Sequence, residues 1–442
     1  MFCKFCGTKM GDGEKICPKC GKKNGSDALM IVFAAIAGVL LVAILTVVVL
    51  LGTGVLDKKD TAGTTAPTED LGTIPTDGDP NNETCKGTYS GTDDQAAAQK
   101  DQVVATLGEH KLTNGHFQMY YWTASQQILQ YGSYYGVDLE KPLDRQIQDE
   151  KTGVTWQQYF VANALKLWHG TMVLKTAAQK ENFQLSKEYQ DTLETIDAEM
   201  EKEAKADGFA SVDAMLQKHF GANVTYAVYK EFVVDSWIAS SYQDKMVAEM
   251  EATDAEIEKY YEDNKSALEG YLGITKESGI VVDVRHILYM PDGATSETIR
   301  TETFPDTAWA SAEKKANDIL KQWKDGEATE ESFGELAKKH SMDGSASVGG
   351  LYTGVAEGDM VKAFNDWCFD KERKVGDTGV VKTEFGYHVM YFVGSEAEWI
   401  ASCRDGVKQE KASKWEEDQK KANPAVYDYS KILLANFAFD MS

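Results

Sequence analysis

The segment VVKTEFGYHVMYFV, residues 380–393, decides the fold of the second half of this 442-residue chain. Successive side chains of a strand point to opposite faces, so His388, Met390 and Phe392 share one face here. The turn at Glu384 separates this strand from a preceding one. The segment therefore predicts two consecutive strands, at 379–383 and 386–393.

A further strand and three helices are predicted upstream. The strand at 280–290 alternates, which puts Val284, His286 and Leu288 on one face. Apolar residues at steps of three and four predict a helix at 309–324. The same spacing predicts two more helices, one with Phe333, Leu336, Ala337 and His340, and one with Met360, Phe364 and Phe369. The resulting β-α-α-α-β-β order is that of an α+β domain.

Four segments of this region follow one another in a specific order. They are RHIL (285–288), FGELAKKHSMDGSASVGG (333–350), GDMVKAF (358–364) and VVKTEFGYHVMYFV (380–393). In this order they resemble the parvulin-type peptidyl-prolyl isomerases. The resemblance implies that residues 278–396 form an isomerase domain, which acts on X-Pro peptide bonds and needs no cofactor for that reaction.

The resemblance also implies which residues form the active site. The catalytic positions fall on His286, Asp343, Thr383 and His388. The substrate-binding positions fall on Leu288, Tyr352, Met360 and Phe364. The chain departs from the family pattern GGDLG by reading Gly-Gly-Leu-Tyr-Thr at 349–353. Tyr352 therefore stands where many members have leucine, and we expect it to narrow the pocket for the proline ring.

These residue types suit a reaction that breaks no covalent bond. Rotation about an X-Pro bond meets a barrier of ~20 kcal/mol because resonance stiffens the amide. An apolar pocket that holds the ring and excludes water lowers this barrier, provided that nearby polar groups prefer the twisted amide. We expect His286 and His388 to form a hydrogen-bonded pair, with Asp343 and Thr383 setting the tautomers. Neither histidine is assigned as a general base.

Residues 101–277 predict a mainly α domain, which we expect residues 397–442 to complete. Thr253 and Glu256 form a capping box that begins one of its helices. Aromatic residues are dense between Tyr120 and Trp168, and they form either the core of the domain or an apolar groove for unfolded segments. The layout of this domain with the isomerase domain resembles the PrsA-like and SurA-like foldases. Their clients would be unfolded, exported polypeptides.

Two CxxC pairs near the N-terminus predict a structural zinc site. Cys3, Cys6, Cys17 and Cys20 supply four thiolates at the spacing that one tetrahedral zinc ion requires. Residues 1–27 are thus similar to the zinc ribbons of many bacterial membrane proteins, and zinc binding would supply their folding energy. The ribbon is either a small folded cap or, through its lysines, a docking element for a partner.

A membrane anchor is predicted next to the ribbon. Residues 28–51 contain no ionisable side chain, and as a helix with ~1.5 Å rise per residue they span ~36 Å, enough to cross a bilayer. The lysines that precede them keep the N-terminus in the cytoplasm. Residues 52–100 lack an apolar pattern and predict a flexible linker. The sequence therefore predicts a single-pass protein of the cell membrane with residues 52–442 outside.

Charge and cysteine content narrow the function further. The 46 basic and 70 acidic residues give a formal net charge of −24, which argues against a protein that coats nucleic acid. Cys85, Cys368 and Cys403 lie beyond the predicted membrane helix, so at least one of them has no intramolecular partner. A Cys368–Cys403 disulfide and separate buried thiols both remain open.

Three other functions compete with an isomerase. A non-catalytic holdase is favoured by Tyr352 and the altered glycine motif. A membrane sensor that signals through the ribbon is disfavoured, because a flexible linker transmits little conformational bias. A hydrolase is disfavoured because the sequence has no G-x-S-x-G, H-E-x-x-H or glycine-rich phosphate motif.

Overall fold

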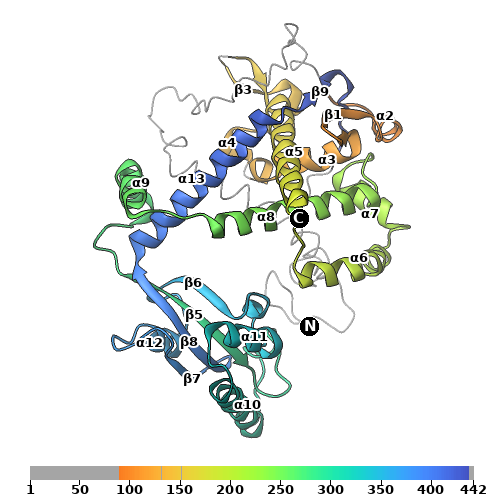
Figure 1. Ribbon diagram of the computed structural model, residues 1–442. Coiled ribbons are helices and arrows are strands. Elements are labelled where there is room, and N and C mark those ends of the chain that lie inside the picture. The colour runs from red at the N-terminus through yellow and green to blue at the C-terminus, as the bar shows by residue number, and fades with distance from the viewer. Residues whose placement is uncertain (1–88, 131, 151, 438–442) are drawn as a thin grey trace. The chain divides into compact units, whose positions relative to one another are not determined.

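The computed structural model describes residues 89–130, 132–150 and 152–437 (Figure 1). The predicted zinc ribbon, the predicted transmembrane helix and residues 52–88 of the predicted linker lie outside these ranges. Within the described ranges, no helix has the length and apolar character needed to span a bilayer.

The chain divides into two compact units. Unit 1 holds the described residues up to Met250 together with those from Gln409 on, and unit 2 holds residues 251–408. The first boundary differs from the one expected at 277, and the second lies inside the helix α13 (Glu398–Ala422). Residues 251–277 belong to unit 2 because Ile257 and Tyr261 pack with Cys403 in one apolar cluster.

Unit 1 is mainly helical, as the sequence predicts. Its core lies between α3 (Asn114–Gln130), α5 (Trp156–Lys180) and α8 (Tyr226–Glu249). The remaining elements are α2 (Asp93–Ala98), β1 (Val103–Leu107), β2 (His110–Thr113), α4 (Gly132–Tyr135), η2 (Leu143–Arg145), β3 (Ile147–Asp149), β4 (Val154–Thr155), α6 (Lys187–Ala206), α7 (Val212–Phe220), β9 (Val426–Tyr427) and η5 (Tyr429–Lys431).

Side-chain caps and buried aromatic rings explain these helices. Thr155 and Gln158 form a capping box that begins α5. The side chains of Phe117, Phe160 and Trp168 are almost completely buried in the core. These aromatic residues therefore form part of the interior of the domain.

The predicted linker ends earlier than expected. Tyr89 is buried, its backbone N–H donates to the side chain of Gln157, and its carbonyl accepts from the N–H of Leu434. The prediction of a flexible linker is therefore wrong for residues 89–100. Its composition could not reveal this, because the partners that order the segment come from distant parts of the chain.

The C-terminal residues complete unit 1. Strand β9 pairs antiparallel with β1, which gives a three-stranded sheet in the order β2-β1-β9. Tyr427, Ile432 and Leu434 are buried in the same core as α3 and α5. Unit 1 thus combines residues from both sides of unit 2 in the sequence.

Unit 2 is an α+β domain around one antiparallel sheet in the order β6-β5-β8-β7 (Figure 1). Its strands are β5 (Ile280–Tyr289), β6 (Leu351–Ala356), β7 (Thr378–Thr383) and β8 (Gly386–Ala397). Its helices are α9 (Asp254–Ala267), η3 (Leu268–Leu272), α10 (Asp306–Asp325), α11 (Glu330–His340), η4 (Gly344–Val348) and α12 (Lys362–Cys368), followed by the start of α13.

The order of elements in unit 2 differs from the prediction at one strand. Strand β6 precedes α12 and pairs with β5, so that Tyr352 lies opposite Val284. This edge strand has no clear sequence pattern, because a glycine pair precedes it and Gly354 interrupts its side-chain alternation.

The sheet separates two apolar clusters. Helices α10 and α11 pack on the face that carries Ile287, Val389 and Tyr391. Helix α12 packs on the other face, where Val284 and Met390 contact Phe364. The predicted site residues of β5, β7 and β8 also lie on this second face.

Both described cysteines are buried, free thiols. Cys368 packs with Phe364 beside the sheet, whereas Cys403 packs with Ile257 and Tyr261. The disulfide considered between them is therefore absent from the structure. Cys85 lies outside the described residues.

Candidate active site

Two histidines form the centre of the candidate site. The Nδ1 atoms of His286 and His388 lie 3.0 Å apart, and the two rings stack at a centroid distance of 5.2 Å. Both side chains are at most 5% exposed. The strand register produces this pair, because His388 of β8 lies opposite Leu288 of β5, two residues from His286 on the same face.

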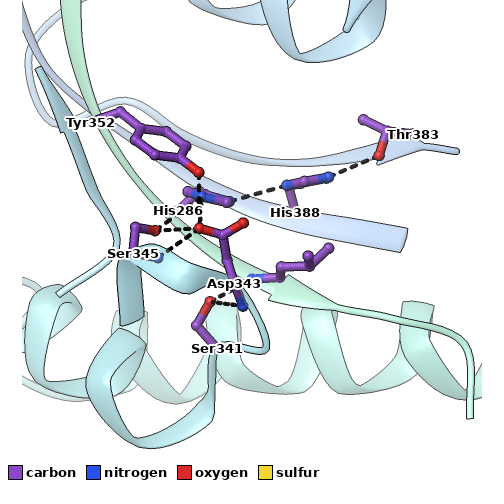
Figure 2. A network of polar contacts seen from close by, with 8 residues as sticks. His286, Ser341, Asp343, Ser345, Tyr352, Thr383 and His388 are labelled. Atoms are coloured by element: carbon purple, nitrogen blue, oxygen red, sulfur yellow. Dashed lines mark hydrogen bonds and ion pairs between the residues drawn. The ribbon is translucent and has the colours of Figure 1, made fainter. Parts of the chain in front are cut away.

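Asp343 stands beside this pair, in the loop between α11 and β6 (Figure 2). Its Oδ1 atom accepts hydrogen bonds from the backbone N–H of Ser345 at 2.9 Å, the hydroxyl of Ser345 at 2.6 Å and the hydroxyl of Tyr352 at 2.9 Å. The same oxygen lies 3.3 Å from Nε2 of His286. No described residue donates a hydrogen bond to the Oδ2 atom of Asp343.

Thr383 closes the other end of the network. Its Oγ1 atom lies 2.8 Å from Nε2 of His388 and accepts the backbone N–H of Phe385 at 3.1 Å. Its hydroxyl proton is thus available to His388. The structure therefore links Thr383, His388, His286 and Asp343 in one chain of contacts.

One arrangement of protons satisfies every contact in this chain. The carboxylate of Asp343 can only accept, so the Nε2 atom of His286 carries a proton and its Nδ1 atom accepts. The Nδ1 atom of His388 then donates to His286, and its Nε2 atom accepts the hydroxyl proton of Thr383. The anion at one end of the chain thus fixes which nitrogen of His286 carries a proton toward Asp343.

The environment shifts the pKa values of two of these groups. Burial raises the pKa of Asp343, but the hydrogen bond and charge of His286 and the hydrogen bonds from Ser345 outweigh burial, so this pKa lies well below its usual range. Burial, followed by the charge of His286, lowers the pKa of His388 to about 3, against a smaller opposing effect of Asp343. At neutral pH the site therefore holds a carboxylate beside a neutral His388.

A pair of glycines brings the loop close to β5. Gly349 and Gly350 both have positive φ angles, +72° and +70°. The carbonyl of Gly350 accepts the N–H of His286 at 2.8 Å, and a Cβ atom on Gly350 would lie 2.1 Å from the carbonyl oxygen of His286. Only glycine fits this approach, which places Tyr352 and the Asp343 loop next to His286.

Aromatic side chains form a wall beside the histidines. The ring of Phe364 lies edge-on to both His286 and His388, with centroid distances of 5.4 Å. The ring of Tyr352 stacks on His286 at 5.0 Å. Met360 packs on the same apolar cluster as Phe364. The site thus combines an apolar wall with a polar network.

The structure brings together all the predicted site residues of unit 2 except Leu288. The side chain of Leu288 is 3% exposed and packs with Met290 and Ile299 in a neighbouring cluster. The strand alternation is as predicted, but Leu288 lies farther along the face than the Phe364 cluster. The predicted zinc ligands lie outside the described residues, and the described residues contain no group of His, Cys, Asp or Glu side chains arranged to hold a metal ion.

Three further residues hold the site and were not predicted. Ser345 donates twice to Asp343, and a polar residue two positions after an aspartate is the usual signal for such a turn. The hydroxyl of Ser341 accepts the N–H groups of Leu288 and Asp343. Arg285 donates to the carbonyl groups of Val348 and Gly349. The tertiary contacts of Ser341 and Arg285 have no local sequence signal.

Comparisons with known proteins agree with this geometry. Residues 270–394 match the family described as the PPIC-type PPIASE domain. The Campylobacter jejuni protein named "Putative peptidyl-prolyl cis-trans isomerase Cbf2" is 30% identical over 194 residues, which cover 43% of this chain and 60% of that protein. Foldase protein PrsA 1 of Listeria monocytogenes is 26% identical over 248 residues, 56% of this chain and 67% of that protein.

Among solved structures, PrsA from Bacillus subtilis is 20% identical with a TM-score of 0.30, and the match covers 61% of this chain and 87% of that one. The chain spans 60% of the length of its Campylobacter relative. The site geometry and the family match coincide in unit 2. Residues 270–394 of this chain therefore belong to the PPIC-type peptidyl-prolyl isomerase domain family.

Proposed function

We propose that unit 2 catalyses the cis/trans isomerisation of X-Pro bonds in unfolded polypeptides. The observation that carries this proposal is the buried network from Thr383 through His388 and His286 to Asp343, placed next to the ring of Phe364. The match of residues 270–394 to the PPIC-type domain supports the same reaction.

The site is suited to this reaction because the reaction rotates a bond and breaks none. Tyr352 and Met360, which are partly exposed beside the buried ring of Phe364, offer apolar surface for the proline ring. Removing water there weakens the solvation that favours the planar amide. The Oδ2 atom of Asp343 provides a fixed negative charge next to this surface. A fixed charge stabilises the charge distribution of the twisted amide without reorganising during the reaction.

A refolding assay tests the isomerase. Substoichiometric, purified full-length protein should accelerate the refolding of a test protein whose slow phase is proline isomerisation, which unaided takes tens to hundreds of seconds. His388→Ala, Asp343→Ala and Phe364→Ala should each reduce the acceleration at least about tenfold. His340→Ala is the matched control, because His340 is exposed at the end of α11. Equal activity in all variants would exclude this site.

A non-catalytic holdase is the second candidate. It is favoured by Tyr352, whose ring occupies part of the wall and whose hydroxyl bonds to Asp343. A holdase suppresses aggregation of an unfolded client at stoichiometric amounts without changing the rate of its proline-limited phase. Suppression that survives in Asp343→Ala, together with an unchanged refolding rate for the native protein, would establish the holdase and reject the isomerase.

We also propose that the chain is a foldase anchored in the cell membrane, with exported polypeptides as clients. Support comes from the apolar segment 28–51, the lysines before it and the relationship to a PrsA foldase. Protease added to intact cells should degrade residues 52–442 and leave a short N-terminal fragment. Full protection of the chain in intact cells, with degradation after lysis, would contradict this topology.

The N-terminal cysteines are proposed to bind one structural zinc ion. Cys3, Cys6, Cys17 and Cys20 have the ligand type and spacing of a tetrahedral zinc site. The purified full-length protein should contain one zinc ion per chain, and Cys17→Ser should lose it. Cys403→Ser is the control, since that cysteine is buried in unit 2. A Cys17→Ser protein that retains full zinc content would reject this ligand set.

A further inference from the structure

The side chain of Tyr352 touches two members of the polar network at once. Its ring stacks on His286 at 5.0 Å with an interplanar angle of 25°, and its hydroxyl donates to Oδ1 of Asp343 at 2.9 Å. Strand β6 holds it there, because Tyr352 pairs with Val284 of β5 in the register of the sheet. Tyr352 therefore has a polar role as well as being a wall of the pocket.

The donors to Asp343 all converge on one oxygen. The hydroxyl of Tyr352, the backbone N–H of Ser345 and the hydroxyl of Ser345 all donate to Oδ1. The Nε2 atom of His286 faces the same oxygen. Figure 2 shows the second carboxylate oxygen directed away from these donors. Because the described residues offer Oδ2 no donor, the carboxylate has one anchored oxygen and one that is available to a ligand.

We propose that Tyr352 is a positioning residue, which holds the carboxylate of Asp343 so that Oδ2 faces the X-Pro bond of the substrate. The inference rests on the proposed isomerase function and adds a determinant that a leucine at this position could not supply. A leucine has no donor, so the carboxylate would keep only the contacts from Ser345 and His286. The stacking of the tyrosine ring holds its hydroxyl in a defined direction toward Asp343.

The charges around the carboxylate make this role measurable. Asp343 faces His286 from β5, Tyr352 from β6 and Ser345 from η4, and its charge acts in turn on His388 of β8, whose pKa it raises. The pKa of Tyr352 is raised to about 12, by burial first and then by Asp343, so its hydroxyl stays a donor across the working range. Removing this donor destabilises the carboxylate and raises the pKa of Asp343.

The test compares full-length Tyr352→Phe with the native protein. NMR exchange on an X-Pro peptide, at increasing peptide concentration and across the pH range in which the protein stays folded, gives kcat, KM and their pH profile. Tyr352→Phe keeps the aromatic ring, so we expect kcat to fall about tenfold with KM within twofold. We also expect its acid limb to move to higher pH. Ser345→Ala, which removes another donor to the same oxygen, should shift the limb in the same direction.

Tyr387→Phe is the matched control, because Tyr387 lies on the opposite face of the sheet, beside α10 and α11. Its kcat and pH profile should equal those of the native protein. A kcat for Tyr352→Phe within twofold of the native value, or a loss carried by KM alone, would overturn the positioning role while leaving the isomerase intact. A native protein without activity would reject the proposed function itself, and the inference with it.

Discussion

The Nδ1 atoms of His286 and His388 face each other at 3.0 Å, so only one proton fits between the two rings. Two positively charged rings in this position would direct two N–H groups at one another in a buried site. The pair is therefore stable only while at least one ring is neutral. Uptake of a proton that would leave both rings charged should consequently oppose folding.

Acid should destabilise unit 2 through His388. An unfolded histidine has a pKa near 6.5, and burial followed by the charge of His286 lowers the pKa of His388 to about 3. The unfolded chain thus binds this proton more readily than the folded chain does. The stabilisation that the neutral ring provides is therefore complete above pH ~6.5 and decreases as the pH falls toward ~3. The decrease is at most about 1.4 kcal/mol per pH unit. Urea unfolding at pH 7 and pH 5 should show a smaller decrease for His388→Asn than for the native protein.

His110 and His169 of unit 1 also have lowered pKa values, mainly through burial, and they contribute to the pH dependence of the whole chain. The comparison with His388→Asn removes their contribution because both proteins share it. The lowered pKa of Asp343 acts in a separate window, with its stabilisation present above pH ~3.8 and lost below it. Identical pH dependence in the two proteins would contradict the neutral His388.

Removing the hydroxyl of Thr383 should lower the free energy of unfolding more than the small size of this group suggests. Thr383→Val leaves Nε2 of His388 and the N–H of Phe385 without their partner, and we expect a loss of about 1–3 kcal/mol in the free energy of unfolding. Thr383→Ser keeps the oxygen and should lose less, with most of its isomerase activity retained. Urea unfolding and peptide isomerisation of both variants check this, and equal losses would show that the methyl group matters more than the hydroxyl.

A methyl group at Gly350 should disrupt the site from the backbone. Its Cβ atom would lie 2.1 Å from the carbonyl oxygen of His286, and its φ of +70° already disfavours other residues. We expect Gly350→Ala to destabilise unit 2 by more than about 3 kcal/mol. Gly354→Ala is the control, since it has a similar φ of +64° but no atom within 4 Å of the added Cβ. A denaturation midpoint that is the same for both variants would contradict the close approach.

A buried ion pair in unit 1 gives a further prediction. Lys175 and Asp235 lie 2.5 Å apart between α5 and α8, with side chains 16% and 10% exposed. Lys175→Met leaves the buried Asp235 without its partner and should cost about 3 kcal/mol of stability, whereas the double replacement Lys175→Met/Asp235→Leu should restore much of it. Lys187→Met, in an exposed pair, should cost less than about 1 kcal/mol. Denaturant titration of these three variants measures the losses. Equal stability of Lys175→Met and Lys187→Met would contradict the prediction.

The sequence predicts the parts of the fold that local patterns determine. The alternation in β5 and β8 places the histidines on one face, and helical spacing identifies α10 and α11. Strand β6 was missed because a glycine pair precedes it and Gly354 interrupts its side-chain pattern, so that no local pattern marks it. The ordering of Tyr89 was missed because Gln157 and Leu434, which supply its contacts, are distant in sequence.

In the candidate site, too, residue types could be predicted from sequence, whereas contacts between distant residues could not. The resemblance identified His286, Asp343, Thr383 and His388 by type, and the structure links them through contacts of at most 3.3 Å. Sequence could not indicate that Tyr352 donates to Asp343, because a residue at a pocket position is expected to be apolar. The hydrogen bond depends on the direction of the ring, which the β5–β6 register and the stacking on His286 determine.

The pairing of β1 with β9 has a consequence for synthesis. Ala105 pairs with Tyr427, so the ribosome must translate all of unit 2 before this sheet can form. All the strands of the unit 2 sheet, in contrast, lie between Ile280 and Ala397 and are complete earlier. As the nascent chain emerges, the isomerase domain can fold first. The first half of the helical domain cannot complete its sheet until β9 has been synthesised.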